Sequence, residues 1–88
     1  MTKLFIIAGN VNEFKHWWRQ NPNSPESIYV DSVIRLKGIH APRGRFIGTW
    51  YRRNDIEDII LQLQVASSIT PVKAQEIINE YKSRQKNP

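Results

Sequence analysis

The residues whose types best suit chemistry lie between Thr49 and Arg53, where two aromatic rings are followed by two guanidinium groups. Aromatic rings stack on bases and arginines bind phosphates, so this stretch predicts contact with single-stranded nucleic acid or with a nucleotide edge. The alternative is structural, because the tryptophan can complete a core while the arginines pair with nearby aspartates. The candidate nucleic-acid-binding residues here are Trp50, Tyr51, Arg52 and Arg53.

A second basic pair, Arg43 and Arg45, precedes this stretch and joins the candidate nucleic-acid-binding residues. Residues 35 to 53 contain six basic residues and no acidic one, so the net charge of +5 arises in this part of the chain. Such a cluster attracts polyanions. The alternatives are that a small domain needs net charge for solubility, and that the two arginine pairs are unrelated polar ends of one strand.

Gly9 and Asn10 follow an apolar run and precede a helical pattern, which is where a phosphate-binding turn is found. The turn has neither the three spaced glycines of a dinucleotide fingerprint nor the Gly-Lys-Ser/Thr of a phosphate loop. Exposed helix N–H groups can still hold one anion, so these two residues define a degenerate candidate site for an anion or nucleotide. The alternative is a tight turn with an asparagine cap.

Trp17 and Trp18 are adjacent, so on a helix they point about 100° apart and cannot both face the core. Tryptophan and arginine are over-represented at the centres of protein interfaces. An exposed tryptophan beside Arg19 is therefore a candidate anchor for a protein partner, unless it covers a sheet edge. We take Trp18 and Arg19 as the candidate partner-binding residues.

No set of residues predicts catalysis or metal binding. His16 and His40 lack a ligand spacing such as His-x-x-x-His, and the chain has no cysteine. Asp55 and Asp58 fall in the first turn of a predicted helix, where the helix dipole accounts for negative charge. A nucleophile, a base and an orienting group cannot be assembled. We therefore expect a protein that is not an enzyme and that needs neither cofactor nor metal.

Three short segments predict the strands that must position these residues. The segment from Leu4 to Ala8 is a continuous apolar run, which is typical of a strand covered on both faces. Two further segments are short and rich in β-branched or aromatic residues, and they are Ser27 to Val30 and Arg45 to Trp50.

Helical patterns separate and follow the strands. Asn10 or Asn12 can cap a first helix, and a short second helix ends at Gly38. Asn54 and Glu57 form a capping-box pattern before the third helix, whose apolar stripe is Ile56, Ile59, Ile60 and Leu63. Thr70 and Pro71 begin the last helix, whose apolar stripe is Ala74, Ile77, Ile78 and Tyr81.

This order of elements predicts one α/β domain over residues 1–88, with a three-stranded parallel sheet, helices on its faces and a C-terminal helical hairpin. We predict the strand order 2-1-3, because the first strand has no polar interruption and belongs in the centre. Ligands bind such sheets at the carboxyl ends of the strands. That edge carries Gly9, Asn10, Asp31 and residues 49–53.

Two motifs carry a family resemblance. The run Phe5-Ile-Ile-Ala-Gly-Asn before the first helix, and Ile47-Gly-Thr-Trp-Tyr-Arg-Arg-Asn-Asp-Ile-Glu before the third, resemble short Rossmann-like proteins of unassigned function encoded by bacteriophages. The resemblance covers about residues 3 to 63 and brings no catalytic residue with it. It implies a small accessory protein that works inside a bacterial cell during infection.

The sequence therefore predicts a non-enzymatic basic binding module that contacts nucleic acid. A protein-protein adaptor or inhibitor of a host factor, using Trp18 or the C-terminal helix, is the first alternative, and a degenerate nucleotide-binding domain is the second. The longest apolar run is too short to span a bilayer, no signal peptide is recognisable, and cysteine is absent, so we expect a cytoplasmic protein.

Overall fold

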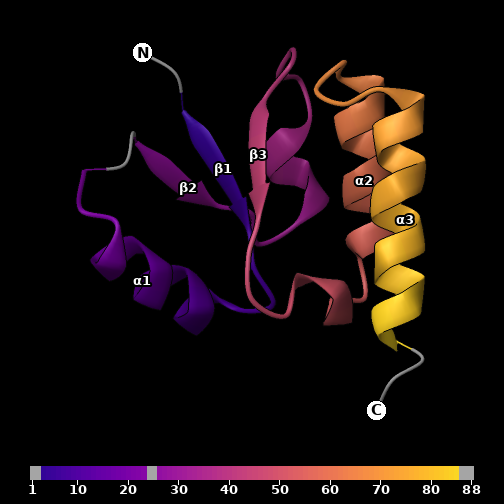
Figure 1. The fold of residues 1–88 in the computed structure, drawn as a ribbon. Coiled ribbons are helices and arrows are strands. Elements are labelled where there is room, and N and C mark those ends of the chain that lie inside the picture. Colours follow the sequence, from indigo (N-terminus) through magenta and orange to yellow (C-terminus); the bar gives the residue numbers. More distant parts are fainter. Residues whose placement is uncertain (1–2, 24–25, 86–88) are drawn as a thin grey trace.

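A parallel sheet of three strands forms the centre of the fold (Figure 1). The structure is a computed structural model that describes residues 3–23 and 26–85. The order of the strands is β2-β1-β3, which confirms the predicted 2-1-3 arrangement. The strands are β1 (Leu4–Ile7), β2 (Ser27–Tyr29) and β3 (Arg43–Phe46).

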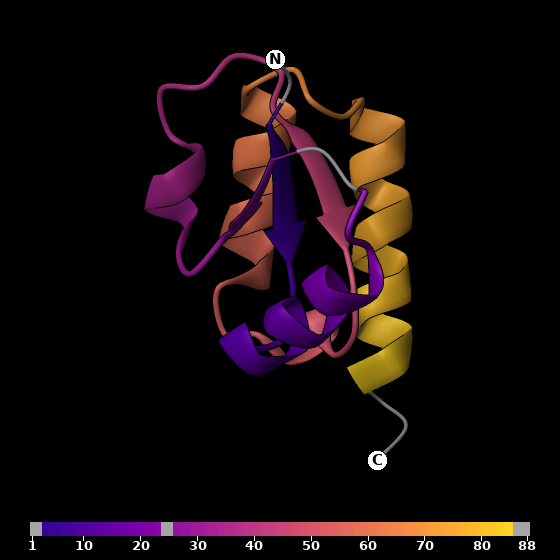
Figure 2. The same cartoon turned by 90° about the vertical axis from the view of Figure 1, so that its left-hand side faces the viewer.

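Helices cover the two faces of the sheet unequally. Figure 2 shows a single helix, α1, in front of the sheet and the hairpin of α2 and α3 behind it. A short 3-10 helix, η1, connects β2 to β3 and packs against α2. The helices are α1 (Val11–Gln20), η1 (Val33–Leu36), α2 (Ile56–Val65) and α3 (Pro71–Gln85). No helix in residues 3–23 and 26–85 is both long and apolar enough to cross a membrane.

The register of the sheet decides which side chains share a face. Leu4 pairs with Arg43 and Ile6 with Arg45, so these four side chains lie on the face toward α1. Phe5 and Ile7 alternate with them and belong to the core under the α2-α3 hairpin. The strand with the least polar sequence is thus buried on both faces, as expected for the central strand.

The main core lies between the sheet and the α2-α3 hairpin. The predicted stripe of the third helix is confirmed, because its four side chains are each at most 1% exposed. Burial of one such isoleucine or leucine is worth about 1.5–3 kcal/mol, which makes α2 the main apolar support of the sheet. The buried residues of this stripe are Ile56, Ile59, Ile60 and Leu63.

The third strand ends earlier than predicted. It stops at Phe46, and Ile47 donates the last backbone hydrogen bond to the carbonyl of Ile7 at 3.0 Å. Gly48 then adopts a φ of 56°, which an extended strand cannot contain. Trp50 consequently lies in a separate 3-10 helix, η2 (Trp50–Arg52), and not at a strand end.

Two of the predicted helix caps form and one does not. The Asn10 side chain accepts from the Glu13 N–H at 3.0 Å, and the Thr70 hydroxyl accepts from the Lys73 N–H at 3.1 Å. The predicted Asn54–Glu57 box is wrong, because Asp55 is the N-cap of α2 and makes no side-chain capping bond. Its carboxylate is instead paired with an arginine in the preceding loop.

Candidate functional site

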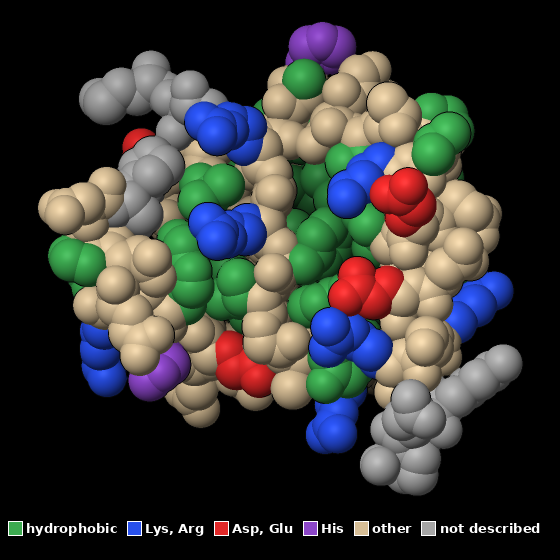
Figure 3. Space-filling view, in the orientation of Figure 1, with side chains coloured by type: hydrophobic (Ala, Val, Ile, Leu, Met, Phe, Trp, Pro, Cys, Tyr) green, Lys and Arg blue, Asp and Glu red, His purple; other side chains and the backbone are tan. Residues whose placement is uncertain are grey.

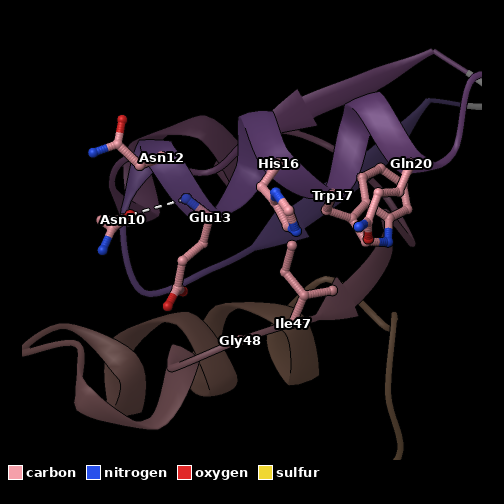
Figure 4. A pocket seen from close by; sticks show the side chains of 8 residues that line it. All are labelled: Asn10, Asn12, Glu13, His16, Trp17, Gln20, Ile47 and Gly48. Atoms are coloured by element: carbon pink, nitrogen blue, oxygen red, sulfur yellow. Dashed lines mark hydrogen bonds between the residues drawn. The ribbon is translucent and has the colours of Figure 1, made fainter.

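A partly buried acid joins the two turns at the predicted edge of the sheet. The Glu13 carboxylate accepts hydrogen bonds from the Gly9 N–H at 2.7 Å, the Thr49 N–H at 3.0 Å and the Thr49 hydroxyl at 2.7 Å. Figure 4 shows this side chain extending from α1 toward Gly48. Burial raises the pKa of Glu13, but these hydrogen bonds and the positive charge of Arg52 outweigh it, so the pKa lies below its usual value.

Two glycines make room for this carboxylate. A Cβ on Gly9 would lie 2.8 Å from Glu13 Oε1 and 2.1 Å from Thr49 Oγ1. A Cβ on Gly48 would lie 2.5 Å from Glu13 Oε1. The glycines are therefore used for a contact within the chain, and not for the close approach of a phosphate.

The degenerate anion site predicted at Gly9 and Asn10 is filled by the protein itself. The Gly9 N–H is bonded to the Glu13 carboxylate, and the Asn10 side chain caps the first turn of α1. An external phosphate would also meet the negative charge of Glu13. The Gly9 N–H and the Asn10 side chain are therefore engaged within the chain, and the nucleotide-binding alternative stays a prediction.

Arg53 is also part of the fold, which corrects its prediction as a nucleic-acid contact. Its side chain is only 6% exposed and pairs with Asp55 at 2.9 Å. Its guanidinium donates to the backbone carbonyls of Ala8 and Asp31, both at 3.0 Å, and to that of Val30. One side chain thus ties the ends of β1 and β2 to the start of α2, and it has no donor left for a phosphate.

The two aromatic residues that precede Arg52 and Arg53 are largely buried. Trp50 is 6% exposed and packs on Phe46, with a ring separation of 4.9 Å, so the prediction that it stacks on a base is wrong and its structural alternative holds. Tyr51 is half-buried, and the Arg84 guanidinium lies over its ring at 5.2 Å. Of these four predicted residues, Arg52 alone is exposed.

The other predicted arginine pair is exposed. Arg43 and Arg45 project from the same face of β3, and neither makes an ion pair within the described part of the chain. The Arg45 guanidinium lies 6.0 Å from the centre of the half-buried Trp17 ring. Figure 3 shows Lys and Arg side chains one above the other next to β3. This pair is therefore available to an anionic partner.

The outer edge of β3 is unpaired in the part of the chain that the structure describes, where β1 is its only neighbour in the sheet. Ile47 donates inward to β1, so alternation along the strand turns the N–H and C=O groups of Gly44 and Phe46 outward. No strand or helix backbone within residues 3–23 and 26–85 bonds to these outward groups. They are free to pair with another extended chain.

A groove of about 440 Å³ runs between this free edge and α3. Figure 3 shows it as a hollow with hydrophobic side chains at its base and charged side chains at its rim. Within the rim, Lys73 is paired with Glu76 at 3.8 Å and Arg84 with Glu80 at 3.0 Å. The groove is lined by Gly44, Phe46, Ile47, Gly48, Trp50, Ile69, Lys73, Ile77, Glu80 and Arg84.

A second hollow, of about 570 Å³, lies between α1 and the turn after β3. The side chains of His16 and Trp17 point toward Ile47 across it (Figure 4). Its polar lining residues are Asn10, Asn12, Glu13, His16 and Gln20. Across the described ranges 3–23 and 26–85, no group of three or more His, Cys, Asp or Glu residues could hold a metal ion.

The predicted partner-binding residues on α1 lie at the surface. Trp18 is 55% exposed and Arg19 is exposed, whereas Trp17 is half-buried against the sheet. One of the two adjacent tryptophans therefore faces the sheet and the other faces solvent, as the angle of about 100° between neighbouring side chains on a helix requires. The structure shows that Trp18 is accessible, and its role as an anchor stays a prediction.

Fold and geometry together define a small α/β protein in which the β3 edge of the sheet lies beside a groove with hydrophobic residues at its base and charged residues at its rim. Comparisons with protein-family models, with curated proteins and with solved structures find no match to the chain. The chemistry of the open edge is therefore the basis on which a function can be argued.

Two features of this site were missed at the level of sequence. Glu13 lies three residues after Asn10, and this Asn-x-x-Glu spacing is the signal of a capping box that could have drawn attention to it. The open edge had no comparable signal, because the predicted third strand began at Arg45 and left Gly44 outside it.

Proposed function

We propose that this chain is a non-enzymatic adaptor that binds an extended segment of a partner protein as a fourth strand beside β3. The observation that carries the proposal is the position of the outward backbone groups of Gly44 and Phe46. They lie at the edge of a groove with hydrophobic side chains at its base, and no other strand of the described residues pairs with them. Strand addition of this kind draws affinity from main-chain hydrogen bonds and specificity from alternate side chains.

The groove can accept every second side chain of an added strand. A strand beside β3 directs every second side chain toward the α3 side, where Trp50 and Ile77 form part of the lining. These residues are 6% and 7% exposed, so they contribute a small apolar area at the base of the groove, and the half-buried side chains of Phe46 and Ile69 add to it. The other side chains of the added strand lie on the face that carries Arg43 and Arg45.

Isotope-edited NMR titration with short synthetic peptides tests this proposal. The probes are capped hexapeptides in which valine alternates with threonine, glutamate or lysine. Binding of any one of them should shift the amide resonances of Gly44 and Phe46. If no member of the set shifts these resonances at millimolar concentration, the proposed function is wrong.

A pair of variants at Gly44 locates the binding. Gly44→Pro removes the outward N–H and leaves the inward bonds to β1 in place, since those come from the neighbouring residues. Gly44→Ala adds a Cβ that meets Ile7 Cδ1 at an acceptable 3.4 Å, and it keeps the N–H. Peptide binding should be lost in the proline variant and kept in the alanine variant. Lys73→Trp, which fills the groove from α3 without altering β3, should also abolish it.

Nucleic-acid binding is a second candidate, favoured by the exposed arginine pair beside Trp17. Guanidinium groups and an aromatic ring on one face suit single-stranded nucleic acid. Binding of a dodecamer of deoxythymidine should then weaken steeply with salt and be lost in an Arg43→Ala/Arg45→Ala variant. Absence of any retardation at low salt would exclude this function.

We also propose that the protein works in the cytoplasm of a bacterial cell, as an accessory protein of phage type that engages a host factor. The absence of cysteine suits a reducing compartment. The resemblance of the Gly9 turn and of the Gly48-Thr-Trp corner to phage-encoded proteins supports the phage origin.

A further inference from the structure

We infer that the segment accepted at β3 is acidic at alternate positions, with carboxylates over Arg43 and Arg45 and aliphatic side chains in the groove. The inference rests on the proposed function, because it names the partner chemistry of that same edge. It commits to an acidic extended peptide and not to a nucleic acid or a second copy of the chain.

The charges on the two sides of the edge differ. On the α1 side, Arg43 and Arg45 carry two positive charges that make no ion pair in the described residues. On the α3 side, the basic residues at the rim are paired with glutamates of the same helix. An added strand therefore meets net positive charge on one face only.

The alternation of side chains along a strand converts this difference in charge between the two faces into a sequence pattern for the partner. Side chains directly opposite each other on neighbouring strands have Cβ atoms about 4.5–5.5 Å apart, which is within reach of an Arg-carboxylate pair. Residues at every second position of the partner face Arg43 and Arg45, and the residues between them face the groove. The segment should consequently alternate Glu or Asp with Val, Ile or Leu.

The same arginines oppose a second copy of the chain as the occupant. Pairing two β3 edges about a twofold axis perpendicular to the sheet would place Arg43 and Arg45 of both copies on one face. Like charges on adjacent strands are destabilising, and charged side chains on an edge strand are a known device against self-pairing. Sedimentation analysis should therefore find a monomer, and a dimer that is lost in Gly44→Pro would overturn the inference.

The discriminating experiment compares two peptides of equal composition by titration against the full chain. One is capped (Glu-Val)₃ and the other is capped Glu₃Val₃, which has the same charge but no alternation. The alternating peptide should bind at least tenfold more tightly. Equal affinities would mean attraction by charge alone and would overturn the inference.

Charge variants complete the test. Arg43→Gln/Arg45→Gln should weaken binding of (Glu-Val)₃ at least tenfold. Lys37→Gln/Lys82→Gln, a matched loss of two exposed charges away from the edge, should change it less than twofold.

Peptides of other charge separate the two proposals. If (Thr-Val)₃ or (Lys-Val)₃ shifts the amide resonances of Gly44 and Phe46 as strongly as (Glu-Val)₃, the acidic partner is wrong and the adaptor function stands. If none of the peptides shifts them, both are wrong. Displacement of bound (Glu-Val)₃ by micromolar deoxythymidine dodecamer would assign the arginines to nucleic acid instead.

Discussion

The carboxylate of Glu13 on α1 accepts two hydrogen bonds from Thr49, one from the backbone N–H at 3.0 Å and one from the hydroxyl at 2.7 Å. The two residues are 36 positions apart in the chain. Their contact holds α1 against the turn that follows β3, and α1 has no fully buried residue of its own to do so. The position of α1 therefore depends on this polar contact as well as on the half-buried rings of Phe14 and Trp17.

Replacement of Glu13 by alanine should lower the free energy of unfolding by about 2 kcal/mol. The expected loss follows from hydrogen bonds to a charged acceptor, reduced because the site is partly open to water. Urea unfolding monitored by far-ultraviolet circular dichroism measures it. Asn12→Ala, an exposed change one residue earlier in α1, is the control and should stay within about 0.5 kcal/mol. Equal effects of the two substitutions would contradict the role of Glu13.

The contribution of Glu13 should depend on pH. Its pKa is lowered in the folded state, because the hydrogen bonds from Thr49 and Gly9 outweigh the effect of burial. The stabilisation is thus fully present above the unfolded-state pKa, about 4.3, and is lost as the pH falls through the lower folded-state pKa. The difference in unfolding free energy between the native protein and Glu13→Gln should be constant from pH 7 to about 5.5 and should shrink toward pH 3. A difference that grows on acidification would show the opposite sign.

Gly48 and Gly38 offer a matched pair of substitutions. Both have positive φ, 56° and 79°, so alanine at either costs about 1 kcal/mol of backbone strain. A Cβ at Gly38 meets nothing within 4 Å, whereas at Gly48 it lies 2.5 Å from Glu13 Oε1. We expect losses of about 1 kcal/mol for Gly38→Ala and about 3 kcal/mol for Gly48→Ala. In a Glu13→Ala background the two should become alike, and a persisting difference would mean that Glu13 is not the obstacle.

Arg53→Met should destabilise the protein by about 3 kcal/mol or more. Methionine keeps much of the volume but leaves the carbonyls of Ala8 and Val30 without a donor in a buried place. Arg52→Met is the control, since the neighbouring side chain is exposed and should change stability by roughly 0.5 kcal/mol at most. Thermal and urea unfolding of both variants decide the matter. Similar stability of the two variants would imply that Arg53 is not a structural tie.

Much of the fold was predictable because it depends on short-range patterns. The stripe from Ile56 to Leu63 repeats at helical spacing, and only a helix can place these side chains on one face. The uninterrupted apolar run of β1 indicated a central strand, from which the order 2-1-3 followed. The end of β3 was not predictable in the same way, because residues beyond Gly48 have strand-like composition in a chain that has already turned.

The candidate site was predicted less well, and Arg53 shows why. Its sequence context, a basic residue in a polar loop, allowed either a solvated side chain or the pairing with a nearby aspartate that Arg53 makes with Asp55. Its burial results from acceptors that lie 22, 23 and 45 residues away and meet only when the three strands are in register. Arg43 and Arg45 are arginines in an equally basic stretch, but their side chains are exposed. They project from an edge strand that α1 covers only in part.

By itself, the sequence determined the main helices, the apolar segment that becomes the central strand, and the excess of positive charge in the middle of the chain. Spacing and composition carry this information, since they act over a few residues. Only the tertiary structure decided which arginines are free, that Glu13 occupies the Gly9 turn, and that Gly44 and Phe46 present an unpaired backbone beside a groove. Those properties depend on contacts between segments that are far apart in the sequence, and a pattern of a few neighbouring residues does not contain this information.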